Sequence, residues 1–260
     1  MRLAIVGTGM LGGAIARRLA ATRAPGAPDI AVAGRGRPPG RLAGVPGIRE
    51  AATPRAAVAG AEIVLLAVPP AEVAALGLDC PGALVVSVMA GVPLARLGAI
   101  TGAARVVRAM CSPAAEQGLA YTPWIATEFV TDEDRAALND LFAPLGAADE
   151  VGDEALIDLF TALTGPVPGI LAEIARVLIA EAEARGAPPE VADRAVRQLF
   201  LASGEVLGRG ALGAADHVRA MIDYAGTTAA ALESLQAAPL RPALAGALDA
   251  AIRRAGNIAG

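Results

Sequence analysis

The 260-residue chain contains no lysine and a single histidine, His217. All 22 of its basic residues are therefore arginines, which stay protonated and make poor proton shuttles. Reactions that need a lysine or histidine as general acid are disfavoured for this reason. The two cysteines, Cys80 and Cys111, are too few for a disulfide framework or a four-ligand zinc site. We expect both to be ordinary buried thiols, and we expect no metal site.

Other shortages narrow the class of protein. No charge-free run reaches the roughly 18 residues that a membrane span requires. The N-terminus lacks the three-part pattern of a signal peptide. We therefore expect a cytoplasmic protein that does not associate with membranes. The net charge of −4 also argues against nucleic-acid binding, because that function needs a basic surface.

The most specific pattern lies in the first dozen residues. A short apolar run leads into Gly7, Gly9 and Gly12, and a helical stretch follows. In such a strand–turn–helix unit the first glycine makes the tight turn, the second lets the backbone approach a pyrophosphate, and the third allows close packing of helix on strand. The helix N-terminus, with Met10 and Leu11, then faces the phosphates. The motif predicts dinucleotide binding through these five residues, the alternative being a bare structural turn.

In such a unit, the residue that distinguishes NAD from NADP lies about 20 residues further on, at the end of the second strand. There the apolar run over residues 30–33 is followed by Arg35, Arg37 and Arg41, with no acid at this place. A guanidinium matches a ribose 2′-phosphate, whereas an acid would bind the 2′-hydroxyl of NAD. We therefore expect NADPH to be preferred over NADH, with Arg35 as the contact. The alternative is that these are solvated loop arginines.

Short apolar runs alternate with Ala-rich stretches over residues 1–152, which predicts an α/β domain built on a doubly wound parallel sheet. A further helix is expected from Thr131. The carboxyl end of the third strand, at Ala67, Val68 and Pro69, is where such sheets bind ligands, so these three residues are further cofactor candidates. The expected strands are residues 3–6, 30–33, 63–68, 84–88 and 105–109, with a last strand ending near residue 151.

The remaining residues, 153–260, show apolar side chains at helical intervals and no strand pattern. We expect an all-α domain, with long helices over residues 191–207 and 242–255. Alanine and leucine fall on more than one face of these helices, and so small a domain has too little interior to bury them all. The sequence therefore predicts a homodimer formed through the helical domain.

Six segments follow one another along the chain in an order that is typical of a known family. They are the glycine motif over residues 7–15, Ser-Val-Met-Ala-Gly-Val over 87–92, Arg-Ala-Met over 108–110, Thr-Ala-Leu-Thr-Gly over 161–165, Gln198, and Gly-Thr-Thr over 226–228. With these segments, the chain resembles the pyrroline-5-carboxylate reductase family over nearly its full length. The resemblance implies a Rossmann domain, a helical dimerisation domain with the option of higher assembly, and hydride transfer from NADPH or NADH to a cyclic imine, as in proline biosynthesis. It adds Ala90 and Gly91 to the cofactor candidates.

The resemblance also implies a substrate site at Gly226, Thr227 and Thr228, with Thr228 hydrogen-bonded near the imine nitrogen. The alternative is that Thr227 or Thr228 simply caps the helix that follows. Beside this loop, Tyr224 either supplies a hydroxyl to the substrate and covers it, or packs at an interface. Asp223 either pairs with a cationic substrate nitrogen or is a solvated loop acid.

The chain departs from the family where substrate is handled. Asp223-Tyr224-Ala225 stands in place of Ser-Pro-Gly, and Cys111-Ser112 stands in place of Pro-Asn. Unless it is neutralised or turned away, an acid at residue 223 repels an anionic substrate. This puts pyrroline-5-carboxylate itself in question and favours a neutral or cationic imine.

Imine reduction suits the shortage of proton donors. An imine is basic enough to be protonated in solution, so the protein needs to position the reactants and exclude water rather than supply a strong acid. A carbonyl-reducing dehydrogenase, which needs such an acid, is a disfavoured alternative. The other alternative is a non-catalytic NADP-binding dimer that acts as a sensor or scaffold.

The assignment of Arg35 leads to a first prediction. We expect the substitution Arg35→Asp to weaken NADPH binding far more than NADH binding, because the new carboxylate repels the 2′-phosphate that only NADPH carries. Titration of the two nucleotides by calorimetry tests this. Equal losses for both would show that Arg35 does not read the 2′-phosphate.

Overall fold

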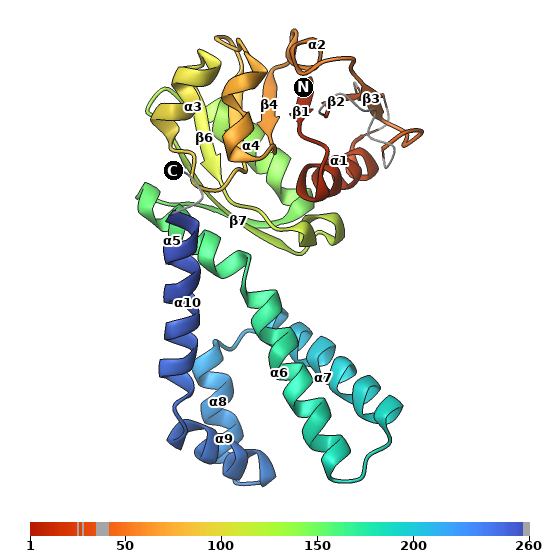
Figure 1. Cartoon of the computed structure of the whole chain (residues 1–260), viewed down its shortest axis with the longest axis vertical. Helices are drawn as coiled ribbons and strands as arrows, with labels where there is room; N and C mark the ends of the chain where they lie inside the picture. Colours follow the sequence, from red (N-terminus) through yellow and green to blue (C-terminus); the bar gives the residue numbers. More distant parts are fainter. Residues whose placement is uncertain (25, 28, 35–41, 257–260) are drawn as a thin grey trace. The chain divides into compact units, whose positions relative to one another are not determined.

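The chain forms two compact units, which the computed structural model describes over residues 1–24, 26–27, 29–34 and 42–256 (Figure 1). The first unit comprises residues 1–165 together with the end of the chain from Ala251, and the second comprises Pro166–Ala250. The predicted division between residues 152 and 153 falls just after the last strand. The contacts within the chain place the division later, after Gly165, because the helix over Glu154–Thr164 packs on the sheet.

The first unit is an eight-stranded sheet in the order β3-β2-β1-β4-β5-β6-β7-β8. Neighbouring strands are parallel except β6 and β7, which are antiparallel. The strands are β1 (Leu3–Val6), β2 (Ile30–Ala33), β3 (Ile48–Glu50), β4 (Ile63–Leu66), β5 (Leu84–Ser87), β6 (Val106–Ala109), β7 (Ala120–Ala126) and β8 (Gly146–Glu150).

Five α-helices and four short 3-10 turns complete the described part of this unit. The helices are α1 (Met10–Thr22), α2 (Pro54–Val58), α3 (Leu94–Thr101), α4 (Asp132–Phe142) and α5 (Glu154–Thr164). The 3-10 turns are η1 (Pro70–Glu72), η2 (Ala74–Leu76), η3 (Pro113–Gln117) and η4 (Ala143–Leu145). Helix α4 begins at the predicted place, because Thr131 and Asp134 form a reciprocal capping box.

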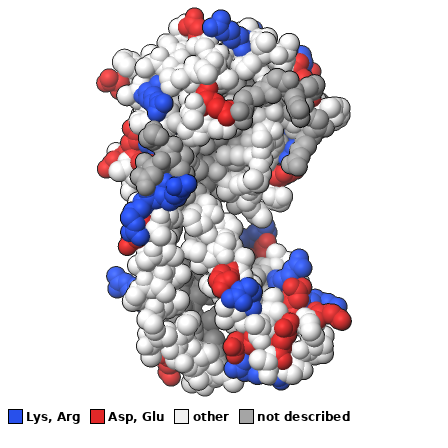
Figure 2. Space-filling view, viewed as in Figure 1, with Lys and Arg blue, Asp and Glu red and all other residues white. Residues whose placement is uncertain are grey.

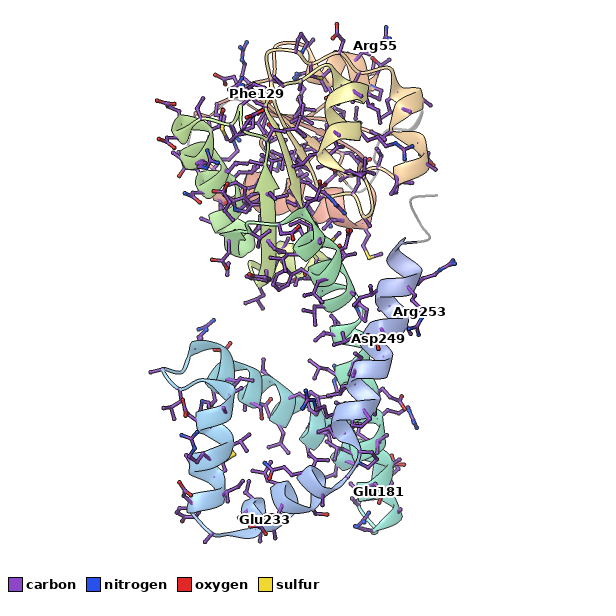
Figure 3. All side chains as sticks on the ribbon, turned by 90° about the vertical axis from the view of Figure 1, so that its left-hand side faces the viewer. Arg55, Phe129, Glu181, Glu233, Asp249 and Arg253 are labelled. Atoms are coloured by element: carbon purple, nitrogen blue, oxygen red, sulfur yellow. The ribbon has the colours of Figure 1, made fainter. Side chains whose placement is uncertain are left out.

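Both faces of the sheet are buried along β1, β2, β4, β5 and β6, which is why most of these strands read as continuous apolar runs, whereas the edge strands β3 and β8 are partly exposed. Along β1, Leu3 and Ile5 point into one core, with Ile15 of α1 and Phe142 of α4. Ala4 and Val6, which alternate with them along β1, belong to a second core that is shared with α2 and α3. Figure 3 shows side chains crowded between these strands and helices. The layering fixes the sheet register, because a shift by one residue would exchange the two cores.

The predicted doubly wound α/β fold is confirmed, with one correction: the sheet is not parallel throughout. Strand β7 was not predicted, because Pro123 in its middle argues against an interior strand. The strand tolerates it, and the Pro123 carbonyl accepts a hydrogen bond from Met110 N. The edge strand β3 was also missed, since Arg49 and Glu50 break its apolar pattern.

The second unit is made of helices alone in its described residues, as predicted. They are α6 (Val167–Ala184), α7 (Pro189–Arg209), α8 (Ala214–Asp223), α9 (Thr227–Ala237) and α10 (Leu240–Gly256), whose last turn is counted with the first unit. Helix α6 packs on α7, and α8 packs on α9.

This unit has almost no interior of its own. Among its described residues, the buried apolar side chains are Ala192, Val196 and Ala229. Large apolar residues such as Leu199 and Leu201 are more than half exposed, and uncharged atoms cover much of the surface seen in Figure 2. Other helices of this unit carry charged side chains, such as Glu181 of α6 and Glu233 of α9, which are labelled in Figure 3. A domain that exposes this much apolar surface needs a second chain to cover it.

One stretch, Glu154–Ala184, is long and apolar enough to cross a membrane by length and composition, and 11% of its most apolar window is buried in this chain. It is not one uninterrupted helix. The turn at Gly165 and Pro166 separates α5 from α6, and α5 packs on β7. Its apolar character therefore has a structural use within a folded protein: one part covers the sheet, and the other belongs to the helical unit.

Candidate functional site

The glycine motif folds into a corner where three backbone segments meet. Gly7 has a φ of +104°, and a Cβ there would lie 2.3 Å from the Ala67 carbonyl oxygen. A Cβ on Gly12 would lie 1.9 Å from the Gly7 carbonyl oxygen. Neither contact leaves room for a side chain. The two glycines therefore perform the roles predicted for the first and third positions, the tight turn and the close packing of helix on strand.

Gly9 differs from Gly7 and Gly12, because no atom of the described residues other than its chain neighbours lies within 4 Å of the position that its Cβ would take. It is the N-cap of α1 and brings no side-chain cap, and the first turn of the helix contains no acid. Met10, the first residue of the helix, is 73% exposed. The helix therefore presents uncapped backbone N–H groups to open space, which is the arrangement that binds a pyrophosphate.

The other cofactor candidates of the first unit lie where β4 and β5 end. Ala67 contacts the glycine corner directly, through its carbonyl beside Gly7. Pro69 is exposed and Ala90 is half-buried, whereas the Val68 side chain is 8% exposed and belongs to the core. Val68 can thus meet a ligand only through its backbone. These ends sit beside the glycine corner because β4 is the neighbour of β1 and β5 the neighbour of β4.

Gly91 follows in the loop after β5, with a φ of +71° that favours glycine. Arg35, the predicted reader of the 2′-phosphate, lies outside the described residues, as do Arg37 and Arg41. The structure does describe the strand that leads to them: β2 ends at Ala33, whose carbonyl accepts a hydrogen bond of 2.8 Å from Gly7 N.

The predicted substrate residues lie together in the second unit, at the junction of α8 and α9. Asp223 is the last residue of α8, and Tyr224 is 88% exposed. Ala225 has a φ of +54°, the only non-glycine residue with a positive φ in the described chain. This left-handed conformation costs an alanine about 1 kcal/mol relative to glycine. It is the residue that replaces glycine in the family pattern.

The same junction shows whether Thr227 or Thr228 caps the helix, which was the alternative to a role in substrate binding. The N-cap of α9 is Gly226, without a side-chain cap, so Thr227 and Thr228 are the first two residues of the helix. The alternative that one of them caps the helix is therefore wrong. Both threonines are exposed, and no acid lies in the first turn. Their hydroxyls and the backbone N–H groups of this helix start remain free to meet a ligand.

Sequence reasoning missed a charged cluster under the carboxyl edge of the sheet. Arg108 of β6 is 3% exposed, and its Nη1 donates to Glu154 Oε1 over 2.9 Å. Its Nη2 donates to Asp158 Oδ1 over 2.5 Å. Both acids belong to α5, so the cluster ties this helix to the sheet. The signal in the sequence was a lone arginine inside an apolar strand, because a buried guanidinium requires acidic partners.

Neither cysteine is prepared for nucleophilic chemistry. Burial raises the pKa of the Cys80 thiol, and the charge of Asp79 raises it further. Burial also raises the pKa of the Cys111 thiol, partly offset by hydrogen bonds with Thr122 and Ser112. Both are free thiols that stay protonated at neutral pH, in agreement with the expectation of ordinary buried residues. Within the described residues, no three His, Cys, Asp or Glu side chains gather as metal ligands would.

A cavity of about 880 Å³ opens at the opposite, amino edge of the sheet. It is lined by strand beginnings such as Arg2, Glu62 and Arg105, and Arg105 pairs there with Asp134 over 2.6 Å. Open α/β sheets bind their ligands at the carboxyl ends of the strands. This cavity is therefore not at the edge where a dinucleotide is expected, whereas the glycine corner is.

The geometry of the corner separates two substitutions that look alike in sequence. We expect Gly9→Ala to leave the free energy of unfolding within about 0.5 kcal/mol of the wild-type value, because its methyl group meets none of the described residues beyond the chain neighbours. We expect the same substitution to weaken NADPH binding by an order of magnitude or more. Gly12→Ala is the matched control, and we expect it to destabilise the fold by roughly 2 kcal/mol or more, because the methyl group overlaps the Gly7 carbonyl. Urea unfolding and calorimetric titration measure the two effects. A stable Gly9→Ala protein with normal NADPH affinity would show that the cofactor does not approach this backbone.

Comparison with known proteins bears on both units. Residues 154–258 match the family model for pyrroline-5-carboxylate reductase dimerisation, and residues 2–91 match the model described as NADP oxidoreductase coenzyme F420-dependent. The chain is 33% identical over 259 residues to the pyrroline-5-carboxylate reductase of Thermus thermophilus, a match that covers 98% of this chain and 97% of that protein. The similarity therefore extends across both the sheet and the helical unit.

Solved structures agree in fold. The chain is similar to a pyrroline-5-carboxylate reductase from Coxiella burnetii, with a TM-score of 0.89 and 24% identity over 100% of this chain and 98% of that one. It is also similar to the pyrroline carboxylate reductase of Plasmodium falciparum with NADP bound, with a TM-score of 0.82 and 18% identity over 100% and 98% of the two chains. The resemblance expected from the sequence is confirmed. The chain belongs to the pyrroline-5-carboxylate reductase family of NADP-dependent oxidoreductases that act on imine groups, with a Rossmann-type sheet domain and a helical dimerisation domain.

Proposed function

We propose that this protein uses NADPH to reduce the C=N bond of a neutral or cationic cyclic imine. The observation that carries the cofactor half of the proposal is the open space at Gly9 beside the uncapped start of α1. The observation that carries the substrate half is Asp223, the last residue of α8. It belongs to the junction of α8 and α9 over residues 223–228, which we call the substrate turn. The apolar helical unit and its match to a dimerisation model support a homodimer as the working form.

The residues at the carboxyl edge of the first unit fit a dinucleotide. Gly7 and Gly12 shape the corner, and Gly9, Met10 and Leu11 would hold the pyrophosphate with backbone N–H groups. Ala67, Val68, Pro69, Ala90 and Gly91 would contact the remainder of the nucleotide along the ends of β4 and β5, and Arg35 would hold the 2′-phosphate. When bound, NADPH supplies the hydride; the protein supplies position and the exclusion of water.

The substrate turn offers groups of two kinds. Gly226, Thr227 and Thr228 begin α9 and present hydroxyl and N–H groups, and we assign to Thr228 the hydrogen bond near the imine nitrogen. Tyr224 is almost fully exposed in this chain and is available to cover the substrate. No lysine is present to act as a proton donor, which fits a substrate that arrives already protonated.

Asp223 decides the substrate class. A negative side chain at the last residue of a helix faces the negative end of the helix dipole, so this position is unfavourable for an acid on structural grounds alone. The carboxylate would attract a protonated imine and repel a substrate carboxylate. We therefore propose that the preferred imine lacks a carboxylate. A cytoplasmic location, where NADPH is available, is part of the same proposal.

Two alternatives remain distinguishable from imine reduction. A non-catalytic NADP-binding sensor would bind NADPH without ever transferring its hydride. A carbonyl-reducing dehydrogenase would show the titration of a protein-borne acid in its pH–rate profile. We favour imine reduction over both because of the family membership and because the chain has no lysine and one histidine.

Thr228 is tested by removing its hydroxyl. We expect Thr228→Ala to lower kcat by about tenfold or more, because a hydrogen bond to a charged group is worth ~1.5–3 kcal/mol, while NADPH affinity is unchanged. Thr228→Ser keeps a hydroxyl and is the control that should retain most of the turnover. Unchanged turnover in the alanine variant would show that the Thr228 hydroxyl does not contact the substrate.

The substrate class is tested with a panel of cyclic imines with and without a carboxylate, following the loss of NADPH absorbance. We expect the wild-type protein to show a higher kcat/KM for 1-pyrroline than for pyrroline-5-carboxylate. We expect Asp223→Asn to reverse or narrow that preference by about tenfold, since removal of a nearby like charge is worth ~1 kcal/mol or more. Tight NADPH binding without turnover of any imine would defeat the proposed function, whereas a wild-type preference for the carboxylated imine would defeat only the role of Asp223.

A further inference from the structure

We propose that Glu154, the first residue of α5, is a positioning residue that holds the cofactor loop in shape. The cofactor loop is defined here as residues 88–93, which connect β5 to α3 and contain Ala90 and Gly91. The inference rests on the proposed contact of these two residues with NADPH. It assigns a role to an acid that lies 60 residues away in the sequence from the helix start it serves.

The first observation is a helix start that lacks a cap of its own. Helix α3 follows Pro93, which has no side chain that can accept a hydrogen bond, and the first turn contains no acid. Instead, Leu94 N donates to Glu154 Oε1 over 2.9 Å. A carboxylate at the N-terminus of a helix satisfies a free N–H group and faces the positive end of the helix dipole. Glu154 thus serves as the cap that the local sequence does not provide.

The second observation is that the loop is fixed at its other end as well. Val88 N donates to the Leu66 carbonyl of β4 over 3.0 Å, and Met89 N donates to Ser87 Oγ over 3.2 Å. Ser87 is fully buried. Between this end and Leu94, the half-buried residues Ala90 and Gly91 form the part of the loop that is free to face a ligand. The shape of that part therefore depends on both anchors.

The third observation is that Glu154 is itself held by a buried charge. The same Oε1 that accepts from Leu94 also accepts from Nη1 of Arg108, over 2.9 Å. Arg108 is 3% exposed, lies in β6 and pairs in register with Ser87 of β5. Its second partner, Asp158, has no contact with the loop in the hydrogen bonds of the described residues. The cluster therefore contains one acid, Glu154, that caps α3 at the end of the loop, and one acid, Asp158, that does not.

This difference supplies a matched pair of variants. Glu154→Ala removes the cap and one partner of Arg108, while Asp158→Ala removes only a partner of Arg108. We expect Glu154→Ala to raise the Kd for NADPH about tenfold, because without the cap the loop keeps its binding shape in only about a tenth of the molecules and the apparent affinity falls by that fraction. We expect Asp158→Ala to leave that Kd within about twofold. Glu154→Gln keeps an oxygen that can accept from Leu94 N, and we expect it to restore affinity to within about threefold of the wild type.

Amide hydrogen exchange gives a readout that does not depend on catalysis. Exchange across residues 89–94 should be faster in Glu154→Ala than in Asp158→Ala or the wild type, and the KM for NADPH should rise while the KM for the imine is kept. The proposal is overturned if the two alanine variants change NADPH affinity and loop exchange equally, or if the loop exchanges as in the wild type in both. A wild-type protein that turns over no imine, with these differences in binding and exchange intact, would defeat the proposed function and leave the role of Glu154 standing.

Discussion

The close approach of three backbones at Gly7, Gly12 and Ala67 is the constraint on which the rest of the first unit depends. It brings the start of α1 against the ends of β1 and β4, so that the helix dipole and its free N–H groups point out of the carboxyl edge of the sheet. At Gly9, in contrast to Gly7 and Gly12, a Cβ would meet no described residue other than the chain neighbours. The space that the protein leaves there is the space that a pyrophosphate needs.

The second unit follows from a different constraint, the shortage of interior. Its helices carry apolar side chains on several faces, and within one chain only small patches of α7 and α9 are buried. The hydrophobic effect therefore cannot be satisfied by one copy, and the family's dimerisation domain is the structural answer. The same composition makes the stretch over Glu154–Ala184 resemble a membrane span. Its apolar residues are better understood as parts of a sheet-covering helix and of a subunit interface.

The chain passes between the two units twice, after α5 at residues 165–166 and within α10 at residues 250–251. The charged cluster of Arg108, Glu154 and Asp158 fixes α5 to the sheet. A buried guanidinium with two acids makes α5 part of the first unit, although its sequence reads like the helices that follow. The cluster explains why contacts divide the chain after Gly165, while the change from strands to helices comes near residue 152. It also brings an acid to the loop that follows β5.

The sequence by itself determined the glycine corner, most of the strands, the helical character of the second half, and the family, because each depends on local patterns such as apolar runs and glycine spacing. It did not reveal β7, whose proline reads as a strand breaker, or the antiparallel pairing of β6 with β7, which depends on partners distant in the chain. Tertiary structure alone decided that Gly226 caps α9, that Ala225 takes a left-handed conformation, and that Glu154 caps a helix 60 residues away. The Glu154 cap arises where segments distant in the chain meet, which no local pattern encodes. The turn at Ala225 and Gly226 is local, but alanine rarely takes a left-handed conformation, so its sequence did not predict that geometry.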